Sequence, residues 1–388
     1  MKVRGRVLVL AVSIPVIAFA VIGGFMGKAM AREDSYQFLR IFEDVVSLIV
    51  NNYVEDVNVD KVMRGAMHGL ADGLDPDSAY LEPAQVKVID KGEAMGAAHS
   101  GLEITRQYYL RVIAARDGSP AARAGLMPGD YIRAIDGQST RDTSAYEGQR
   151  LLRGKSGSKV RLTVLRGNAA EPHDVELVRE ELPAAPVKSR IAAPGTGYVR
   201  VAEFSKATAD QMKSEIASLA KAGATRLVID LRGNAFGDVE LGLGAAKLFV
   251  KSAVLVYRQD RGKEKEAVSA LPSDGAVTLP VAVLTDNGTS GAAEVFAAAL
   301  SGNKRASLIG ERTLGRAARQ KLVRLPDGSA LMLTHLIYLT PASVAIHEKG
   351  LIPDIGVEQP DVEFGQTPAA KDPTLEKAIE SFAQKAAA

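Results

Sequence analysis

The chain has 388 residues, of which 46% are hydrophobic and 24% charged, with a formal net charge of +2. This length exceeds one ordinary hydrophobic core and predicts two or three domains. Basic residues (48) and acidic residues (46) balance and only 5% are aromatic, which argues against a nucleic-acid surface and favours protein or peptide partners. Without cysteine the fold needs no disulfide, and a thiol protease is excluded.

The N-terminus has three basic residues and then an apolar run over 7–27. Such a run is long enough to cross a membrane, and the positive charge before it places the N-terminus in the cytoplasm. We therefore expect residues 1–31 to anchor the chain in the inner membrane, with the rest in the periplasm or cell envelope. The alternative is a signal peptide cleaved near Ala31, because Ala29-Met30-Ala31 has the small-x-small form of a cleavage site.

A helical region is expected over 32–95. Apolar residues recur at helical spacing along 35–50, and a second helix is expected over 59–70, ending at the Gly73–Ser78 turn. These amphipathic helices offer a surface for a homodimer.

Residues 96–182 show short strands separated by turn signals. Ser119-Pro120 predicts a helix start, and Asp136-Gly137 predicts a hairpin. The runs Gly118–Ala121, Ala124–Leu126, Pro128–Asp130 and Ile135–Gly137 resemble a PDZ domain. PDZ domains bind an extended C-terminal peptide as an added strand, so the expected partners are protein or peptide C-termini.

The PDZ resemblance implies which residues bind the peptide: Ser100, Gly101, Leu102, Glu103 and Ile104. It also implies a helix over 142–152 along the groove. A PDZ fold used only as a spacer or lid is the alternative.

Residues 190–360 alternate between strand and helix patterns. Strands are expected over 198–204, 226–231 and 280–285, and helices from 208, over 239–250 and over 292–300. This alternation predicts an α/β layer with parallel strands. Residues 361–388 are interpreted as a polar tail.

Two segments of this third region resemble the carboxy-terminal processing peptidases, a family of PDZ-containing tail-specific serine proteases. Residues 287–294, Asn-Gly-Thr-Ser-Gly-Ala-Ala-Glu, are similar to the family's nucleophile segment, and residues 310–320 to its lysine loop. The resemblance covers about 36–358. It implies a multidomain α/β fold, with a helical segment, a PDZ domain and a Clp-protease/crotonase-like β/α core.

The sequence departs from the family pattern at both catalytic positions. Gly291 stands where the family has its serine, and Arg316 where it has its general-base lysine, while Gln320 matches the family's glutamine. Glycine has no nucleophile. A guanidinium stays protonated at neutral pH and cannot accept the proton of a serine hydroxyl.

The resemblance also places an oxyanion loop at Phe236, Gly237 and Ala292. Ala235 and Phe236 replace the usual proline and first glycine, and a side chain at 236 narrows the site and restricts positive φ. We therefore expect the oxyanion donor at this loop to be impaired.

Neighbouring residues offer weaker alternatives. Ser290 is a candidate substitute nucleophile, although a serine at a helix N-terminus commonly caps backbone N–H groups instead. Glu294 is interpreted as a capping carboxylate. The five histidines have no metal-ligand spacing, so neither a metal nor a cofactor is expected.

These observations favour an exported, non-hydrolysing pseudoprotease that binds C-termini or a partner through its PDZ domain and cleft. One alternative is an active serine-type endopeptidase that cleaves near C-termini with rearranged residues including Ser290. A second is a structural envelope subunit.

Overall fold

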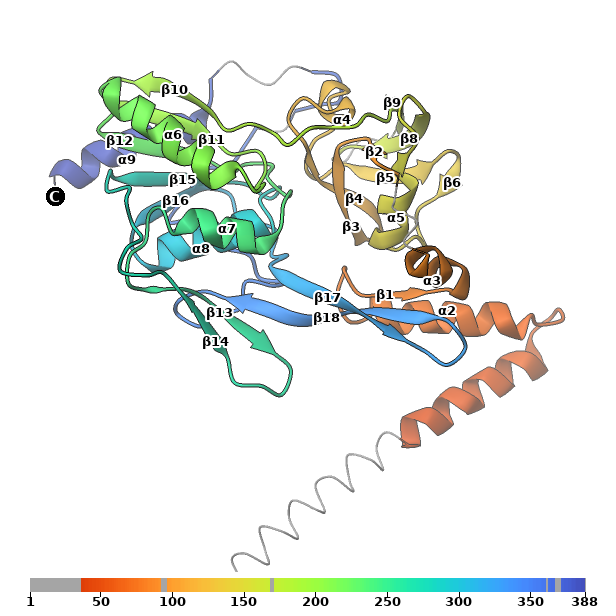
Figure 1. The fold of residues 1–388 in the computed structure, drawn as a ribbon. Coiled ribbons are helices and arrows are strands. Elements are labelled where there is room, and N and C mark those ends of the chain that lie inside the picture. Colours follow the sequence, from red (N-terminus) through yellow and green to blue (C-terminus); the bar gives the residue numbers. More distant parts are fainter. Residues whose placement is uncertain (1–35, 92–95, 168–170, 361, 367–370, 388) are drawn as a thin grey trace, which may run out of the picture. The chain divides into compact units, whose positions relative to one another are not determined.

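The computed structural model describes residues 36–91, 96–167, 171–360, 362–366 and 371–387 (Figure 1). The chain divides into two compact units, Met1–Gly69 and Leu70–Ala388. The apolar run 7–27 lies outside the described residues. Among the helices that are described, none has the length and apolar character needed to cross a membrane.

The first unit is helical in its described part. Residues 36–52 form one helix, and α2 (Val59–Asp72) begins after Asn58, whose side chain accepts a hydrogen bond from the Lys61 N–H at 2.9 Å. The helix 36–52 exposes many large apolar side chains, among them Phe38, Leu39, Ile41, Val45, Leu48 and Val50.

In the second unit, residues 98–178 form the predicted PDZ domain. Its six-stranded sheet has the order β3-β4-β5-β8-β9, with β6 beside β5. Ser119 accepts a hydrogen bond from the Ala122 N–H and Pro120 occupies the first helical position, which confirms the predicted helix start. The elements are β2 (Ala98–His99), β3 (Leu102–Gln107), β4 (Tyr109–Ala115), α4 (Pro120–Arg123), β5 (Tyr131–Ile135), β6 (Gln138–Ser139), α5 (Ala145–Leu151), β7 (Arg153–Gly154), β8 (Lys159–Leu165) and β9 (His173–Val178).

A second six-stranded sheet forms the core, in the order β10-β11-β12-β15-β16-β19. All its neighbours pair in parallel except β10 and β11, which confirms the predicted α/β layer. The elements are β10 (Lys188–Ala193), β11 (Thr196–Arg200), α6 (Thr208–Lys221), β12 (Arg226–Asp230), α7 (Val239–Ala246), β15 (Val281–Thr285), α8 (Ala292–Gly302), β16 (Ala306–Gly310) and β19 (Ile355–Gly356). Helix α8 is buried along most of its length because its residues are mainly alanine, valine and phenylalanine.

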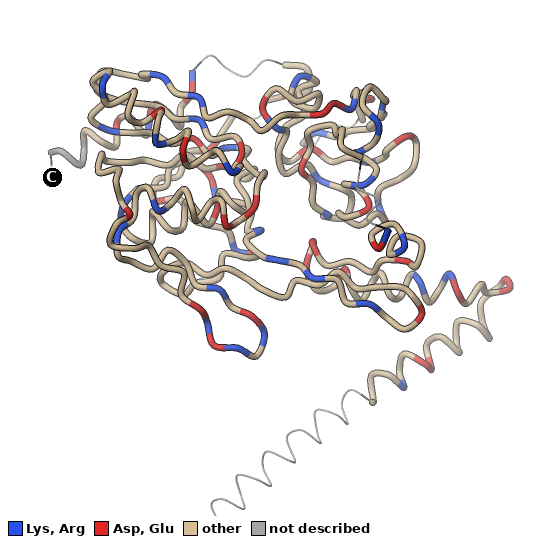
Figure 2. The backbone as a smooth tube through the Cα atoms, viewed as in Figure 1, with Lys and Arg blue, Asp and Glu red and all other residues tan. Residues whose placement is uncertain are grey.

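An antiparallel sheet of five strands lies beside this layer, in the order β1-β18-β13-β14 with β17 on β18. Its strands are β1 (Ala79–Leu81), β13 (Val254–Asp260), β14 (Glu266–Ser269), β17 (Ala318–Arg324) and β18 (Ala330–Leu339). Helix α3 (Pro83–Asp90) follows β1, and its Val86 packs with Leu81 and Ala330. Figure 2 shows basic and acidic residues interspersed along the described chain.

The segment interpreted as a polar tail contains a helix, α9 (Pro373–Ala387). Its Leu375, Ala378 and Phe382 are buried against the sheet residues Val228 and Leu284, so the helix covers one face of the core sheet. The tail interpretation therefore missed this helix. Its apolar residues Leu375, Ala378, Ile379 and Phe382 do recur at helical spacing, with polar and charged residues between them.

Candidate functional site

The candidate site begins at the turn between β15 and α8. The Asp286 carboxylate fixes this turn, since it accepts hydrogen bonds from the Gly233 N–H (2.8 Å), the Gly288 N–H (3.0 Å) and the Thr289 hydroxyl (3.0 Å). Burial raises the pKa of Asp286, while the hydrogen bonds from Gly233 and Thr289 oppose the rise.

Gly291 is the N-cap residue of α8 and has φ 58° and ψ −113°. This region of backbone space strains any residue with a side chain. A strained strand-to-helix turn is the geometry that presents the serine in α/β-hydrolases. A Cβ built on Gly291 would have the Arg316 carbonyl oxygen, 4.0 Å away, as its nearest neighbour. The turn thus has room for a side chain but carries none.

Ser290 lies one residue before the helix cap. Its N–H donates to the Asn234 carbonyl at 2.9 Å, and its own carbonyl accepts from the Ala293 N–H at 3.2 Å. The residue is 2% exposed. The N-cap position belongs to Gly291 and not to Ser290, because Gly291 is the non-helical residue directly before the first helical residue, Ala292.

Glu294 joins the start of α8 to the loop before β17. Its carboxylate accepts hydrogen bonds from the N–H groups of Gly291 (3.0 Å), Gly315 (2.6 Å) and Arg316 (2.7 Å), and from the Thr313 hydroxyl (2.5 Å). Burial raises the pKa of Glu294 to about 7 against these donors. The predicted capping role is confirmed, and the same carboxylate also positions residue 316.

The Arg316 side chain contacts two carboxylates. Its Nε lies 2.6 Å from the Asp77 carboxylate, and its Nη1 lies 2.8 Å from Glu103 and donates to the Ile104 carbonyl at 3.2 Å. Burial alone would lower the pKa of Arg316, but Asp77 and Glu103 outweigh burial and hold this pKa above its ordinary value. Burial raises the pKa of Glu103 despite Arg316. Gln320, on β17, donates to the Thr334 hydroxyl at 3.2 Å.

The loop that the family resemblance assigns to the oxyanion site follows β12. The Phe236 N–H donates to the Asn234 side-chain oxygen at 3.3 Å, and the Phe236 carbonyl accepts from the Phe204 N–H at 3.0 Å. Gly237 has a positive φ of 110°, and a Cβ there would meet the Phe204 carbonyl oxygen at 2.1 Å. Ala292 is buried as the first residue of α8.

The five residues assigned to peptide binding lead into and start β3. Ser100 and Gly101 precede the strand, and the Gly101 N–H donates to His99 Nδ1 at 3.1 Å. Leu102, Glu103 and Ile104 lie in β3, next to helix α5. The Leu102 carbonyl accepts a hydrogen bond from the Gln149 side chain of α5 at 3.4 Å.

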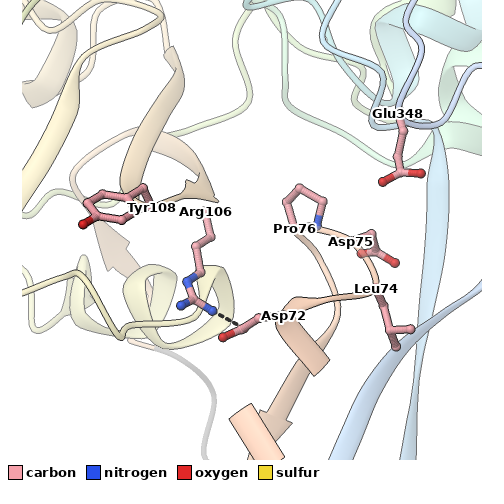
Figure 3. Close-up of a pocket in the computed structure, with 7 residues that line it drawn as sticks. All are labelled: Asp72, Leu74, Asp75, Pro76, Arg106, Tyr108 and Glu348. Carbon is pink, nitrogen blue, oxygen red and sulfur yellow. Dashed lines mark ion pairs between the residues drawn. The ribbon is translucent and has the colours of Figure 1, made fainter. Parts of the chain in front are cut away.

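A pocket of about 370 Å³ lies where the tip of the β3–β4 hairpin meets the segment before β1. Figure 3 shows Arg106 and Tyr108 on one side of Leu74, Asp75 and Pro76, with Glu348 on the other. Arg106 forms an ion pair with Asp72. Asp75 accepts hydrogen bonds from the N–H groups of Asp77 (2.9 Å) and Ser78 (2.8 Å), which shapes the turn that presents Asp77 to Arg316.

Sequence reasoning did not identify Asp77, Asp286 and Asn234 as contributors to this region. Asp77 lies in the turn-rich segment 73–78, where aspartates are common turn residues. Its sequence context therefore does not predict an ion pair with Arg316. Within the described residues, no group of three or more His, Asp or Glu side chains is placed to hold a metal ion.

Comparison with known proteins identifies both folded regions of the second unit. The family model described as peptidase family S41 matches residues 195–357, and the PDZ domain model matches residues 111–166. The solved photosystem II D1 C-terminal processing protease superposes with a TM-score of 0.66 at 28% identity, covering 82% of this chain and 92% of that chain.

Curated relatives extend the similarity over most of the chain. The carboxyl-terminal-processing protease of Synechocystis sp. is 33% identical over 316 residues, which are 79% of this chain and 73% of the relative. The carboxy-terminal-processing protease of Bartonella bacilliformis is 30% identical, over 85% of this chain and 77% of the relative. The resemblance read from the sequence is thereby confirmed, and the chain belongs to the carboxy-terminal processing proteases of peptidase family S41.

Proposed function

We propose that this chain is a non-hydrolysing member of its family and that it binds protein C-termini through its PDZ domain. The observation that carries the proposal is the turn at Gly291. This turn has the strained backbone of a nucleophile site, yet it carries no side-chain atom that can attack an amide carbon.

The position of Arg316 supports the same proposal. A general base must be neutral before it accepts a proton, and Arg316 is held cationic between Asp77 and Glu103. In an unrelated serine protease, loss of the nucleophile alone lowers turnover by on the order of 10⁶. Without a nucleophile, a base has nothing to activate.

The oxyanion loop gives further support. The Phe236 N–H already has an acceptor in the Asn234 side chain, so this N–H is not directed at a substrate oxygen. An oxyanion donor must point at the site where negative charge develops. The loop therefore lacks one of the donors that hydrolysis would need.

Peptide binding is the activity that remains for this architecture. An extended peptide adds to the edge of a PDZ strand through main-chain hydrogen bonds, and β3 together with α5 offers such an edge. The proposal includes an anchor over 1–31 that holds the PDZ region (96–182) and the core (190–360) outside the cytoplasm.

The test uses the full chain in detergent with a fluorescein-labelled peptide that ends in valine with a free carboxylate. Anisotropy measures binding, and mass spectrometry of the same samples measures cleavage. We expect binding without cleavage, and no binding of the amidated peptide. Cleavage that Ser290→Ala abolishes would show an active endopeptidase instead. A stable dimer that binds no peptide would favour the structural subunit.

A further inference from the structure

The outer edge of β3 is the place where a peptide strand would add. In the sheet order β3 is the end strand, and its partner within the described residues is β4. Helix α5 lies against β3, since a Cβ on Gly148 would come within 2.7 Å of the Ile104 side chain. An unpaired strand edge offers N–H and C=O groups to an incoming peptide.

Two carbonyls of this strand already accept hydrogen bonds from side chains of the same chain. The Leu102 carbonyl accepts from Gln149 at 3.4 Å, and the Ile104 carbonyl accepts from Arg316 at 3.2 Å. Carbonyls two residues apart point to the same side of a strand. An added peptide strand needs these acceptors for its own N–H groups, so its binding competes with Gln149 and Arg316.

Arg316 competes with an added peptide more strongly than Gln149 does, because both its main chain and its guanidinium are fixed by contacts. Its main-chain N–H is bound by the buried Glu294 carboxylate, and its guanidinium forms ion pairs with Asp77 (2.6 Å) and Glu103 (2.8 Å). The side chains are 24% exposed for Arg316, 4% for Asp77 and 26% for Glu103. Charge-assisted contacts shielded in this way are stronger than exposed surface pairs.

We infer that Arg316 is a latch that closes the PDZ peptide edge from within the chain: a C-terminal peptide adds to β3 only after the guanidinium leaves Ile104 and Glu103. The latch consists of Arg316, Asp77, Glu103 and the Ile104 carbonyl. The inference rests on the proposed peptide-binding function and assigns to the substituted lysine position a role in regulating it. The apparent affinity is lowered by the fraction of molecules in which the latch is closed.

The test compares the affinity of the full chain and its variants for the fluorescein-labelled peptide ending in valine. Arg316→Met keeps an apolar stem but removes the charge and the donors, and we expect it to tighten binding by about tenfold, or about 1.4 kcal/mol. The matched control is Arg312→Met, because Arg312 is an exposed arginine four residues earlier in the chain. This control should leave the affinity unchanged.

A second variant weakens the latch by a substitution outside β3 and α5. Asp77→Asn removes the charge that holds Arg316 Nε, so it should also tighten binding, and the Asp77→Asn/Arg316→Met double variant should gain less than the sum of the single gains. If Arg316→Met fails to fold, Asp77→Asn carries the test alone.

The possible outcomes separate the two claims. Equal affinities of the wild type, Arg316→Met and Asp77→Asn would overturn the latch and leave peptide binding intact. Weaker binding by both variants would also overturn the latch, because it would mean that Arg316 contributes to the peptide site. If neither the wild type nor any variant bound the peptide, the proposed function would fail, and the latch with it.

Discussion

At the residue scale, Gly291 combines a strained backbone with the absence of a side chain. Its φ of 58° favours glycine, since an L side chain at such an angle strains the chain by roughly 1–3 kcal/mol. The space around it is open, with the nearest atom 4.0 Å from a built Cβ. The substitution to glycine therefore removes a nucleophile and relieves strain at the same position.

The first prediction concerns this strain. Gly291→Ala should lower the free energy of unfolding by about 1–3 kcal/mol, measured as a shift of the denaturant transition followed by circular dichroism. The matched control is Gly244→Ala in α7, where a Cβ has no neighbour within 4 Å and the backbone is helical. The control should be neutral or stabilising. A stability gain from Gly291→Ala equal to that of the control would contradict the account.

Glu294 gives the second prediction. Its folded pKa of about 7 lies above the ordinary value of 4.5, so the buried carboxyl favours folding most when it is protonated. This contribution is fully present below about pH 4.5 and is lost as the pH rises through 7. Between these limits the wild type should lose roughly 3 kcal/mol of unfolding free energy relative to Glu294→Gln.

Denaturant unfolding at several pH values measures this difference. The control is Glu376→Gln on α9, where the side chain is exposed. The difference between the control and the wild type should stay constant with pH. Parallel pH profiles for the wild type and Glu294→Gln would rule out Glu294 as the source of the pH dependence.

At the element scale, the helix 36–52 exposes an apolar surface that includes Phe38 (71% exposed) and Leu48 (62% exposed). Exposed large apolar side chains that gather on one element mark an interaction site. We predict that the full chain in detergent forms a dimer by light scattering. Phe38→Glu with Leu48→Glu should make it monomeric, whereas Arg40→Glu, another exposed site on this helix, should not. A wild-type monomer at every concentration would contradict the prediction.

Elements with strong periodicity or turn chemistry could be predicted from the sequence. The buried strands 226–230 and 281–285 and the helix at Ser119-Pro120 follow from continuous apolar runs and from capping residues. Helix α9 was missed although Leu375, Ala378, Ile379 and Phe382 recur at helical spacing, because the alanine-rich and charged composition of the segment is typical of a polar tail. This spacing indicates a helix with one apolar face, but local pattern does not indicate which part of the chain covers that face.

At the scale of the whole molecule, the motif positions of Gly291 and Arg316 could be read from the sequence, but the partners of Arg316 could not. Arg316 and Glu103 are 213 residues apart, and only the folded chain brings them together. Residue type alone indicated that Arg316 cannot act as a base. The contact with the PDZ strand follows from tertiary structure.

The fourth prediction tests how far the chain has departed from hydrolysis. Gly291→Ser with Arg316→Lys should restore little turnover, because the Phe236 N–H is still bonded to Asn234 and a phenyl side chain still occupies the loop. Adding Phe236→Gly should raise kcat for a C-terminal peptide above that of the double variant. Full turnover by the double variant alone would contradict this prediction, because it would show that Phe236 does not prevent hydrolysis.

The central claim is that the site contains no nucleophile, and labelling with a serine-directed phosphonate tests it most directly. Intact-mass spectrometry of the full chain should show no adduct, while the Gly291→Ser/Arg316→Lys/Phe236→Gly variant serves as the positive control. A stoichiometric adduct on the wild type that maps to Ser290 and disappears in Ser290→Ala would contradict the account.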